Sequence, residues 1–180
     1  MKKVLTLSLA IMMVASVAMA DSFGIFADAA GTDGNCTLVP PAFSPFSVYV
    51  VHDSPLGATG SQFKVVNTSG YSLSAAVQGG FLAIGDAFND LALAYGSCRI
   101  GKTSVVALSG FGFPVPGQTC GVVETTPAPG KPAIIAVDCG LLELPATTGK
   151  LVFNANDSCP CIPTVATEES TWGKVKSLYR

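Results

Sequence analysis

The stretch from residue 46 to residue 67 reads FSVYVVHDSPLGATGSQFKVVN, and it decides the fold. Two runs rich in Val, Phe and Tyr, Phe46–His52 and Gln62–Asn67, flank the turn signal Ser54-Pro55-Leu56-Gly57. Short apolar or alternating runs that are bounded by Gly, Pro, Asp and Ser are typical of β-strands, and this stretch has no helical periodicity. It therefore predicts two strands joined by a turn.

The same pattern continues on both sides of this stretch. Further strands are predicted at Ser22–Ala27, Leu73–Val77, Phe81–Ile84, Leu91–Tyr95, Ser104–Ser109, Gly121–Glu124, Ala133–Val137 and Leu151–Asn154. Nine or ten short strands at this spacing favour an antiparallel two-sheet sandwich of immunoglobulin-like type. The body of the chain is therefore expected to be all-β, with most Phe and Tyr residues in its core.

The first twenty residues are typical of a signal peptide. Lys2 and Lys3 precede an apolar run, and Ala18-Met19-Ala20 supplies small residues at the cleavage positions. We expect cleavage before Asp21, with no further apolar stretch long enough to span a membrane. The sequence thus predicts an exported protein of the periplasm, cell surface or extracellular space.

The C-terminal end has a different character from the body. Two prolines close the predicted sandwich, and the polar link that follows leads to TWGKVKSLYR at residues 171–180. A short helix there would place Trp172, Val175 and Tyr179 on one face, although a piece this short is marginal alone in water. Such a tail either docks on the body or serves in sorting and partner docking. The predicted organisation is a signal peptide at 1–20, a β-sandwich at 21–163 and a link with a helical tail at 164–180.

Composition excludes several partners. Of the 10 basic residues, Lys2 and Lys3 belong to the leader, so 8 remain against 12 acidic residues, which gives a net charge of −4. Nucleic acids and anionic membranes require clustered Lys and Arg, and this balance argues against both. A hydrophobic content of 49% is ample for a core and argues against disorder.

Six cysteines in an exported chain predict up to three disulfides. They are Cys36, Cys98, Cys120, Cys139, Cys159 and Cys161. Because only Pro160 separates the last two, we expect them to pair with other cysteines. A local Cys120–Cys139 bridge is the pairing we favour. The alternative of a zinc site lacks paired C-x₂-C knuckles and has only one histidine, His52. The sequence therefore predicts no cofactor.

Two stretches of the sequence fit the residue patterns of catalytic motifs but lack the structural context that those motifs need. Gly96-Ser97-Cys98-Arg99-Ile100-Gly101-Lys102-Thr103 fits the phosphate-loop pattern, but a predicted strand follows it where the mechanism needs a helix. We interpret it as a β-turn between two strands. Ser61-Gln62-Phe63-Lys64 fits the S-x-x-K of penicillin-recognising enzymes, yet its serine opens a predicted strand and not a buried helix.

His52 and the loop carboxylates have ordinary interpretations. A lone histidine at a strand end is typically a satisfied polar residue, and neighbouring Asp53 cannot complete a serine triad by adjacency. The loops that hold Asp28, Asp33, Asp86 and Asp90 would suit calcium, although none matches a known calcium loop. Turn capping is the default for such residues. The predicted catalytic and metal sites are therefore none.

The chain resembles a set of uncharacterised exported bacterial proteins of no known activity. The shared features are Phe23-Gly24-Ile25-Phe26, Asn35-Cys36-Thr37, Tyr49-Val50-Val51, Gly96-Ser97-Cys98 and a W/F-G-x-[VI]-K-x-L-Y-R ending, here Trp172–Arg180. A second, weaker resemblance is to cohesin-like sandwiches, through the strand Ser47–Val51, a Gly-rich turn and the strand Gln62–Val66. This resemblance implies a fold and carries no functional residues.

Together these features predict a non-catalytic exported protein that acts through its surface. Its expected partner is an unknown protein or a surface glycan. A carbohydrate-binding or small-ligand module is the alternative, and an exposed row of aromatic rings on one sheet would favour it. A secreted hydrolase is the third possibility, and two carboxylates converging in a cleft would favour it.

Overall fold

The computed structural model describes residues 21–33, 36–113 and 121–156, and every regular element within them is a strand. The strands are β1 (Ser22–Phe26), β2 (Thr37–Leu38), β3 (Pro45–Asn67), β4 (Leu73–Val77), β5 (Leu82–Asp86), β6 (Asp90–Phe111), β7 (Gly121–Thr126), β8 (Ile134–Asp138), β9 (Glu143–Ala146) and β10 (Lys150–Phe153). In these ranges no helix has the length and apolarity needed to cross a membrane. The predicted all-β class is confirmed.

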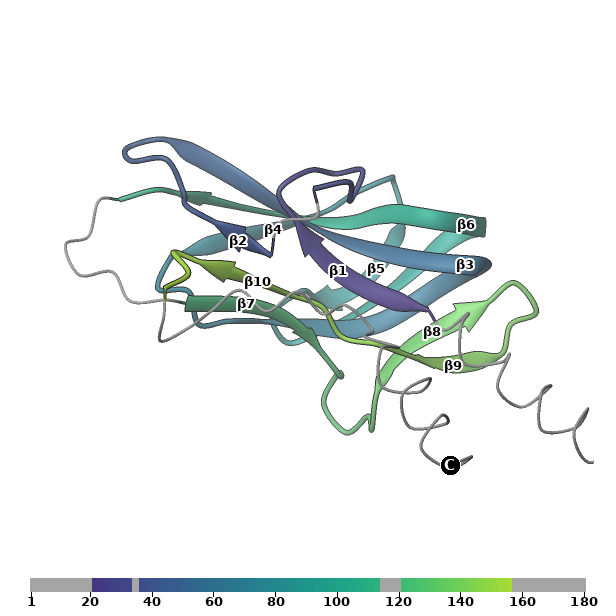
Figure 1. Ribbon diagram of the computed structural model, residues 1–180. Coiled ribbons are helices and arrows are strands. Elements are labelled where there is room, and N and C mark those ends of the chain that lie inside the picture. Colours follow the sequence, from purple (N-terminus) through teal and green to yellow (C-terminus); the bar gives the residue numbers. More distant parts are fainter. Residues whose placement is uncertain (1–20, 34–35, 114–120, 157–180) are drawn as a thin grey trace, which may run out of the picture.

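Two long strands organise the sandwich. β3 and β6 pair antiparallel over most of their length, and their ribbon folds over at one end of the molecule so that its halves lie in different layers (Figure 1). In the first layer β1 pairs with the first half of β3, and β4 pairs with the second half of β6. In the second layer β5 pairs with the first half of β6, while β8 and β7 pair with the second half of β3.

The fold-over lies at the turn signal Ser54–Gly57. Ser54 pairs with Gly101 and Ala58 pairs with Arg99, so three residues of β3 oppose one residue of β6. Proline has no N–H for a ladder and is tolerated at such a bulge, and the positive φ of Gly57, 94°, suits glycine. The two strands predicted at Phe46–His52 and Gln62–Asn67 are therefore halves of one bent strand.

The same correction applies to β6. The predicted strands Leu91–Tyr95 and Ser104–Ser109 belong to one strand of 22 residues, in which Gly96 and Gly101 take positive φ. The segment interpreted as a turn between two strands is the irregular middle of β6. Glycines at irregular positions within a continuous pairing resemble turn residues in sequence, because both need φ values that other residues avoid.

Two strands were not predicted from the sequence, and one pair of strands runs parallel where an antiparallel pair was expected. β2 has only two residues and pairs parallel with β10, whereas the sequence predicted an antiparallel sandwich throughout. β9 contains Pro145, which resembles a break, yet in the described part it pairs only with β8, as an edge strand that tolerates proline. The predicted C-terminal helix lies outside the described residues.

The core fills the space between the two layers. Val48 and Val50 from the first half of β3 belong to the same buried cluster as Phe63 and Val65 from its second half. Alternation along each half turns every second residue inward, as expected for a sheet with one buried face. The rings of Phe46, Tyr71 and Phe153 contact one another near the β10 side, which agrees with the core role predicted for the aromatic residues.

A disulfide joins Cys98 to Cys139, with 5.4 Å between their Cα atoms. The predicted Cys120–Cys139 bridge is therefore wrong. Ala58 of β3 explains the observed pair, because it has Arg99 of β6 as its partner on one side and Asp138 of β8 on the other. The neighbouring cysteines thus meet across β3. Cys36 is disulfide-bonded as well, whereas Cys120, Cys159 and Cys161 lie outside the described residues.

Candidate functional site

A buried polar cluster in the core joins Asp21, His52, Tyr95 and Ser61. His52 Nδ1 lies 2.8 Å from the hydroxyl of Tyr95, and that hydroxyl donates a hydrogen bond to Ser61 Oγ, also at 2.8 Å. Because the tyrosine hydrogen is used in this bond, Nδ1 of His52 must be the donor to Tyr95. Nε2 then carries no proton, and it lies 3.6 Å from Asp21 Oδ2 without a hydrogen-bond partner.

This cluster is structural and not catalytic. His52 is 1% exposed, Tyr95 and Ser61 are 4% exposed and Asp21 is 6% exposed, so no substrate reaches them. The ring of Phe23 stacks on His52 at 4.4 Å between centroids. His52 therefore lies within the core in mid-strand, not at the predicted strand end, and only one of its two nitrogens is satisfied.

Burial lowers the pKa of His52, against the opposing effect of the Asp21 and Asp53 carboxylates. The folded protein therefore keeps this histidine neutral at a pH where the unfolded chain, with a histidine pKa of about 6.5, binds a proton. We expect the free energy of unfolding to fall as the pH drops below about 6.5, by up to about 1.4 kcal/mol per pH unit. Urea unfolding between pH 7.5 and pH 5 measures this slope.

Because the chain has one histidine, the origin of the slope can be assigned. The matched control is His52→Gln, in which the dependence between pH 7 and pH 5.5 should largely vanish. A proton NMR titration of the single imidazole in the folded protein should give a midpoint below that of a histidine peptide. A midpoint above the peptide value would show that Asp21 outweighs burial.

The loop carboxylates cap their own turns. Asp28 accepts hydrogen bonds from the backbone N–H groups of Thr32 and Asp33. Asp86 accepts hydrogen bonds from the side-chain amide of Asn89 and from the N–H of Phe88, and these bonds hold its pKa below the usual value. An acid that stays ionised cannot serve as the proton donor that glycoside hydrolysis needs. The described residues contain no group of three possible metal ligands.

The two letter matches to catalytic motifs lie in strands. The stretch Gly96–Thr103 is part of β6, so no helix follows the glycines to present amides to a phosphate. Ser61 lies in β3, buried in the second layer. The structure thus confirms that neither motif has the context its chemistry requires.

Part of the outward side of the second layer is apolar. Register places three small or polar residues of β6 and β3, Ala92, Ala94 and Gln62, between a pair on β5 and a pair on β8. We call this surface the outer face, and its residues are Leu82, Ile84, Ala92, Ala94, Gln62, Ile135 and Val137. Their immediate neighbours along the strands, such as Leu93 and Ala136, point into the core. Two rows of outward side chains therefore cross four strands.

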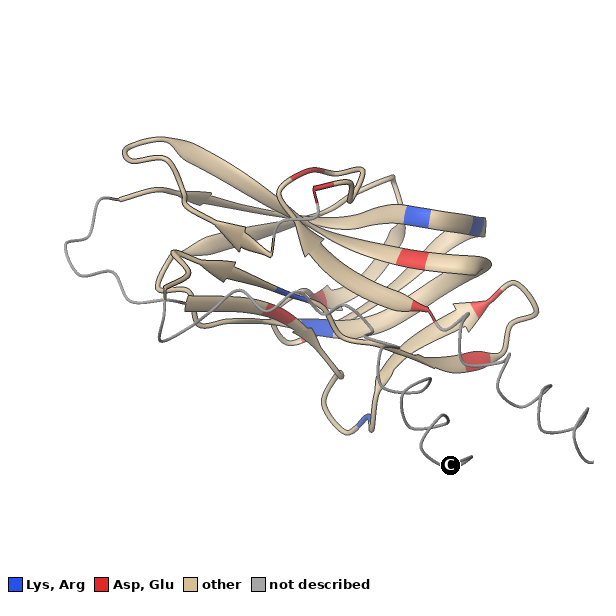
Figure 2. Cartoon of the chain, in the orientation of Figure 1, with Lys and Arg blue, Asp and Glu red and all other residues tan. Residues whose placement is uncertain are grey.

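Leu82 and Ile84 are the prominent members of the outer face, at 68% and 70% exposed. The seven residues that define it carry no charge. Figure 2 marks where the Lys, Arg, Asp and Glu residues lie along the chain. Gln62 donates a hydrogen bond to Asp90 Oδ1 at 2.9 Å, which leaves the middle of the face without a free charged group. Contiguous exposed apolar surface with a polar rim marks an interaction site in soluble proteins.

The Cys98–Cys139 disulfide fixes one end of this surface. It links β6 to β8 across β3, and a Cβ at Gly57 would lie 2.7 and 2.8 Å from its two sulfurs. The bridge therefore packs directly against the bend of β3, where only glycine leaves enough room. Three of the four strands of the outer face are held together at this point.

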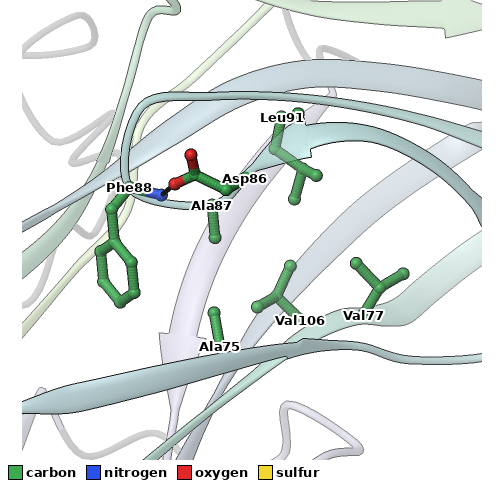
Figure 3. A pocket seen from close by; sticks show the side chains of 8 residues that line it. Ala75, Val77, Asp86, Ala87, Phe88, Leu91 and Val106 are labelled. Atoms are coloured by element: carbon green, nitrogen blue, oxygen red, sulfur yellow. Dashed lines mark hydrogen bonds between the residues drawn. The ribbon is translucent and has the colours of Figure 1, made fainter.

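A cavity of about 250 Å³ opens beside the outer face, between β4 and the turn that joins β5 to β6. Figure 3 shows Ala75, Val77 and Val106 facing Ala87 and Leu91 across this space. Leu91 and Val106 are fully buried and form its inner wall, while Ala75 and Val77 are exposed and lie at its mouth. Apolar side chains thus make up most of the lining.

Sequence reasoning did not single out either feature. Leu82 and Ile84 were assigned to a strand run, and their outward direction depends on which neighbours β5 acquires. Their alternation with the small residues Ala83 and Gly85 favours burial of Leu82 and Ile84, so no signal within β5 predicts their exposure. The predicted docking residues Trp172, Val175 and Tyr179 lie outside the described residues, so the tail stays a prediction.

No protein-family model and no curated protein sequence matches this chain. Among solved structures, a type II cohesin domain from the cellulosome of Acetivibrio cellulolyticus matches with a TM-score of 0.52 at 10% identity, covering 78% of this chain and 98% of that one. The seventh ScaB type I cohesin from Pseudobacteroides cellulosolvens has a TM-score of 0.47 at 11% identity, covering 76% and 94%. A non-cellulosomal cohesin from Archaeoglobus fulgidus has 0.42 at 12%, covering 76% and 94%. The first match shows a cohesin-like fold, as the weaker resemblance implied.

Proposed function

We propose that this chain is a non-catalytic, exported protein-binding module that engages a protein partner through the outer face. The observation that carries the proposal is the pair Leu82 and Ile84, both more than two-thirds exposed on a rigid sheet. Burying such a side chain contributes about 1.5–3 kcal/mol, so two of them suffice as the energetic centre of an interface. The cohesin-like fold and the disulfide are consistent with an exported binding module.

A protein partner fits this surface better than a glycan does. Carbohydrate-binding sheets use aromatic rings for stacking, and the seven residues of the outer face include none. Sugar hydroxyls also require several hydrogen-bonding groups, whereas Gln62 is the one polar side chain there and is engaged with Asp90. A hydrolase is disfavoured because the His52 cluster is closed to substrate and Asp86 is held ionised.

Substitution of Ile84 tests the proposal. Ile84→Asp places a charge in the middle of the contact, and we expect at least a 100-fold loss of affinity, equivalent to about 2.7 kcal/mol. The matched control is Ile100→Asp, because Ile100 is also a strand isoleucine, 74% exposed, but lies at the bend and not on the outer face.

The partner would be obtained by chemical crosslinking of the purified protein to extracellular and envelope fractions of its native host. The affinity of this partner would then be measured by titration against wild type, Ile84→Asp and Ile100→Asp. Binding by wild type and Ile100→Asp, with loss in Ile84→Asp, is the expected result. Equal binding by all three forms would place the contact elsewhere, and a purified glycan as the retained species would favour the carbohydrate-binding alternative.

A further inference from the structure

We infer that the cavity beside β5 is an anchor site, which takes one large apolar side chain from the partner seated on the outer face. This inference rests on the proposed function and specifies what the partner must present: an aromatic ring or a large aliphatic group. The cavity lies where the two layers of the sandwich are open, between β4 of the first layer and the β5–β6 turn of the second.

The size of the cavity suits a single side chain. A cavity of about 150 Å³ lined by aliphatic residues binds benzene, so the 250 Å³ found here admits a ring of indole size or a leucine or phenylalanine side chain. Its inner wall, formed by Leu91 and Val106, is already shielded from water, and an inserted side chain would cover the exposed Ala75 and Val77 at the mouth. Pockets that bury one anchor residue typically contribute most of the binding energy of an interface.

The chemistry of the lining selects for apolar groups. Asp86 is the one ionisable residue in the lining, and its carboxylate already accepts a hydrogen bond from the N–H of Phe88 (Figure 3). It also accepts hydrogen bonds from Asn89. A hydroxyl group placed against the aliphatic walls would find no partner there and would lose its hydration, and a cation would find only the Asp86 carboxylate. The cavity therefore discriminates against sugars and uncharged polar side chains.

The position of the cavity connects it to the outer face. Gly85 and Asp86 of β5 line it, while Leu82 and Ile84 of the same strand belong to the outer face. In the described residues β5 pairs only with β6, so its other edge is open to a partner. A partner segment that crosses this edge would contact the outer face and reach the cavity together, through backbone pairing and one inserted side chain.

Two probes test the inference, and a pair of variants on β4 controls both. Ala75 lines the cavity, so Ala75→Leu fills it, whereas Ala76 is also exposed but points to the opposite side of the strand, so Ala76→Leu leaves the cavity empty. The first probe is indole, titrated by NMR with the methyl groups of Val77, Leu91 and Val106 as reporters. The second is a displayed library of random 12-residue peptides selected on the wild-type protein.

The expected result is that indole shifts these methyl signals and that the selected peptides share one aromatic or large aliphatic residue. Both probes should bind Ala75→Leu at least tenfold more weakly and bind Ala76→Leu like wild type. Indole binding without any peptide competing for it would mean a site for a free apolar molecule, which overturns the inference. Peptides that lack an apolar anchor, or that tolerate Ala75→Leu, overturn it as well.

The two proposals can fail separately. Ile84→Asp should weaken the peptides and leave indole binding unchanged, because Ile84 does not line the cavity. The partner could bind Ile84→Asp more weakly than Ile100→Asp and yet bind Ala75→Leu as tightly as wild type. In that case the anchor site is wrong and the protein-binding function stands.

Discussion

Replacing Cys98 and Cys139 by serine should lower the free energy of unfolding by about 4 kcal/mol. The two residues are 41 positions apart, and in the chain-entropy model a crosslink that closes a loop of this length restricts the unfolded chain by that amount. The bridge also has a local role, because it joins β6 to β8 across the bend of β3. Its loss should therefore loosen the end of the outer face before the rest of the sandwich unfolds.

Urea unfolding without reductant measures the effect, with Ser97→Ala as the control that leaves the neighbouring disulfide intact. Amide hydrogen exchange should locate the loosening at Ala58–Gly60 and Val137–Asp138, while Val48 and Val50 of the first layer stay protected. A loss below about 1 kcal/mol would show that strand pairing alone holds the bend. In that case the disulfide would not be needed to position β8 in the outer face.

The sequence indicated most strands but not how they connect. Local runs such as Gly121–Glu124 correspond to β7 because alternation and β-branched content depend on the strand itself. The continuity of β3 through Ser54–Gly57 depends instead on its pairing with β6, since a Pro-Gly segment looks the same in a bulge and in a turn. The parallel β2–β10 pair and the Cys98–Cys139 bridge likewise depend on distant segments meeting.

The candidate site was less predictable than the fold for the same reason. The side of β5 that faces solvent follows from the register Leu82–Ala94 and Ile84–Ala92, and no pattern within β5 sets that register. The cavity exists because β4 and the β5–β6 turn belong to different layers. By contrast, the turn-capping role of Asp28 and Asp86 was predictable, because each carboxylate bonds to residues within five positions of itself.

Tyr95→Phe should destabilise the protein by about 3 kcal/mol although it removes a single oxygen atom. The hydroxyl accepts from His52 Nδ1 and donates to Ser61 Oγ, and both groups are buried. Removing it leaves a donor and an acceptor without partners, and each unsatisfied buried group costs about 1–3 kcal/mol. The matched control is Tyr49→Phe, because Tyr49 is a half-buried tyrosine of β3 outside this cluster, and we expect a change below about 0.5 kcal/mol.

The effect of Tyr95→Phe should also depend on pH, which separates it from a simple packing defect. Once the Tyr95 hydroxyl is gone, nothing fixes the Nδ1 tautomer of His52, and the ring is free to place a proton on Nε2 facing Asp21 at 3.6 Å. The pKa of His52 should then fall further, because the neutral imidazole already makes the hydrogen bond to Asp21 and a proton added at Nδ1 would find no partner. The unfolding free energy of the variant should therefore fall at least as steeply below pH 6.5 as that of wild type, and it should continue to fall to a lower pH. Parallel pH profiles for the two proteins would show that Tyr95 does not set the tautomer.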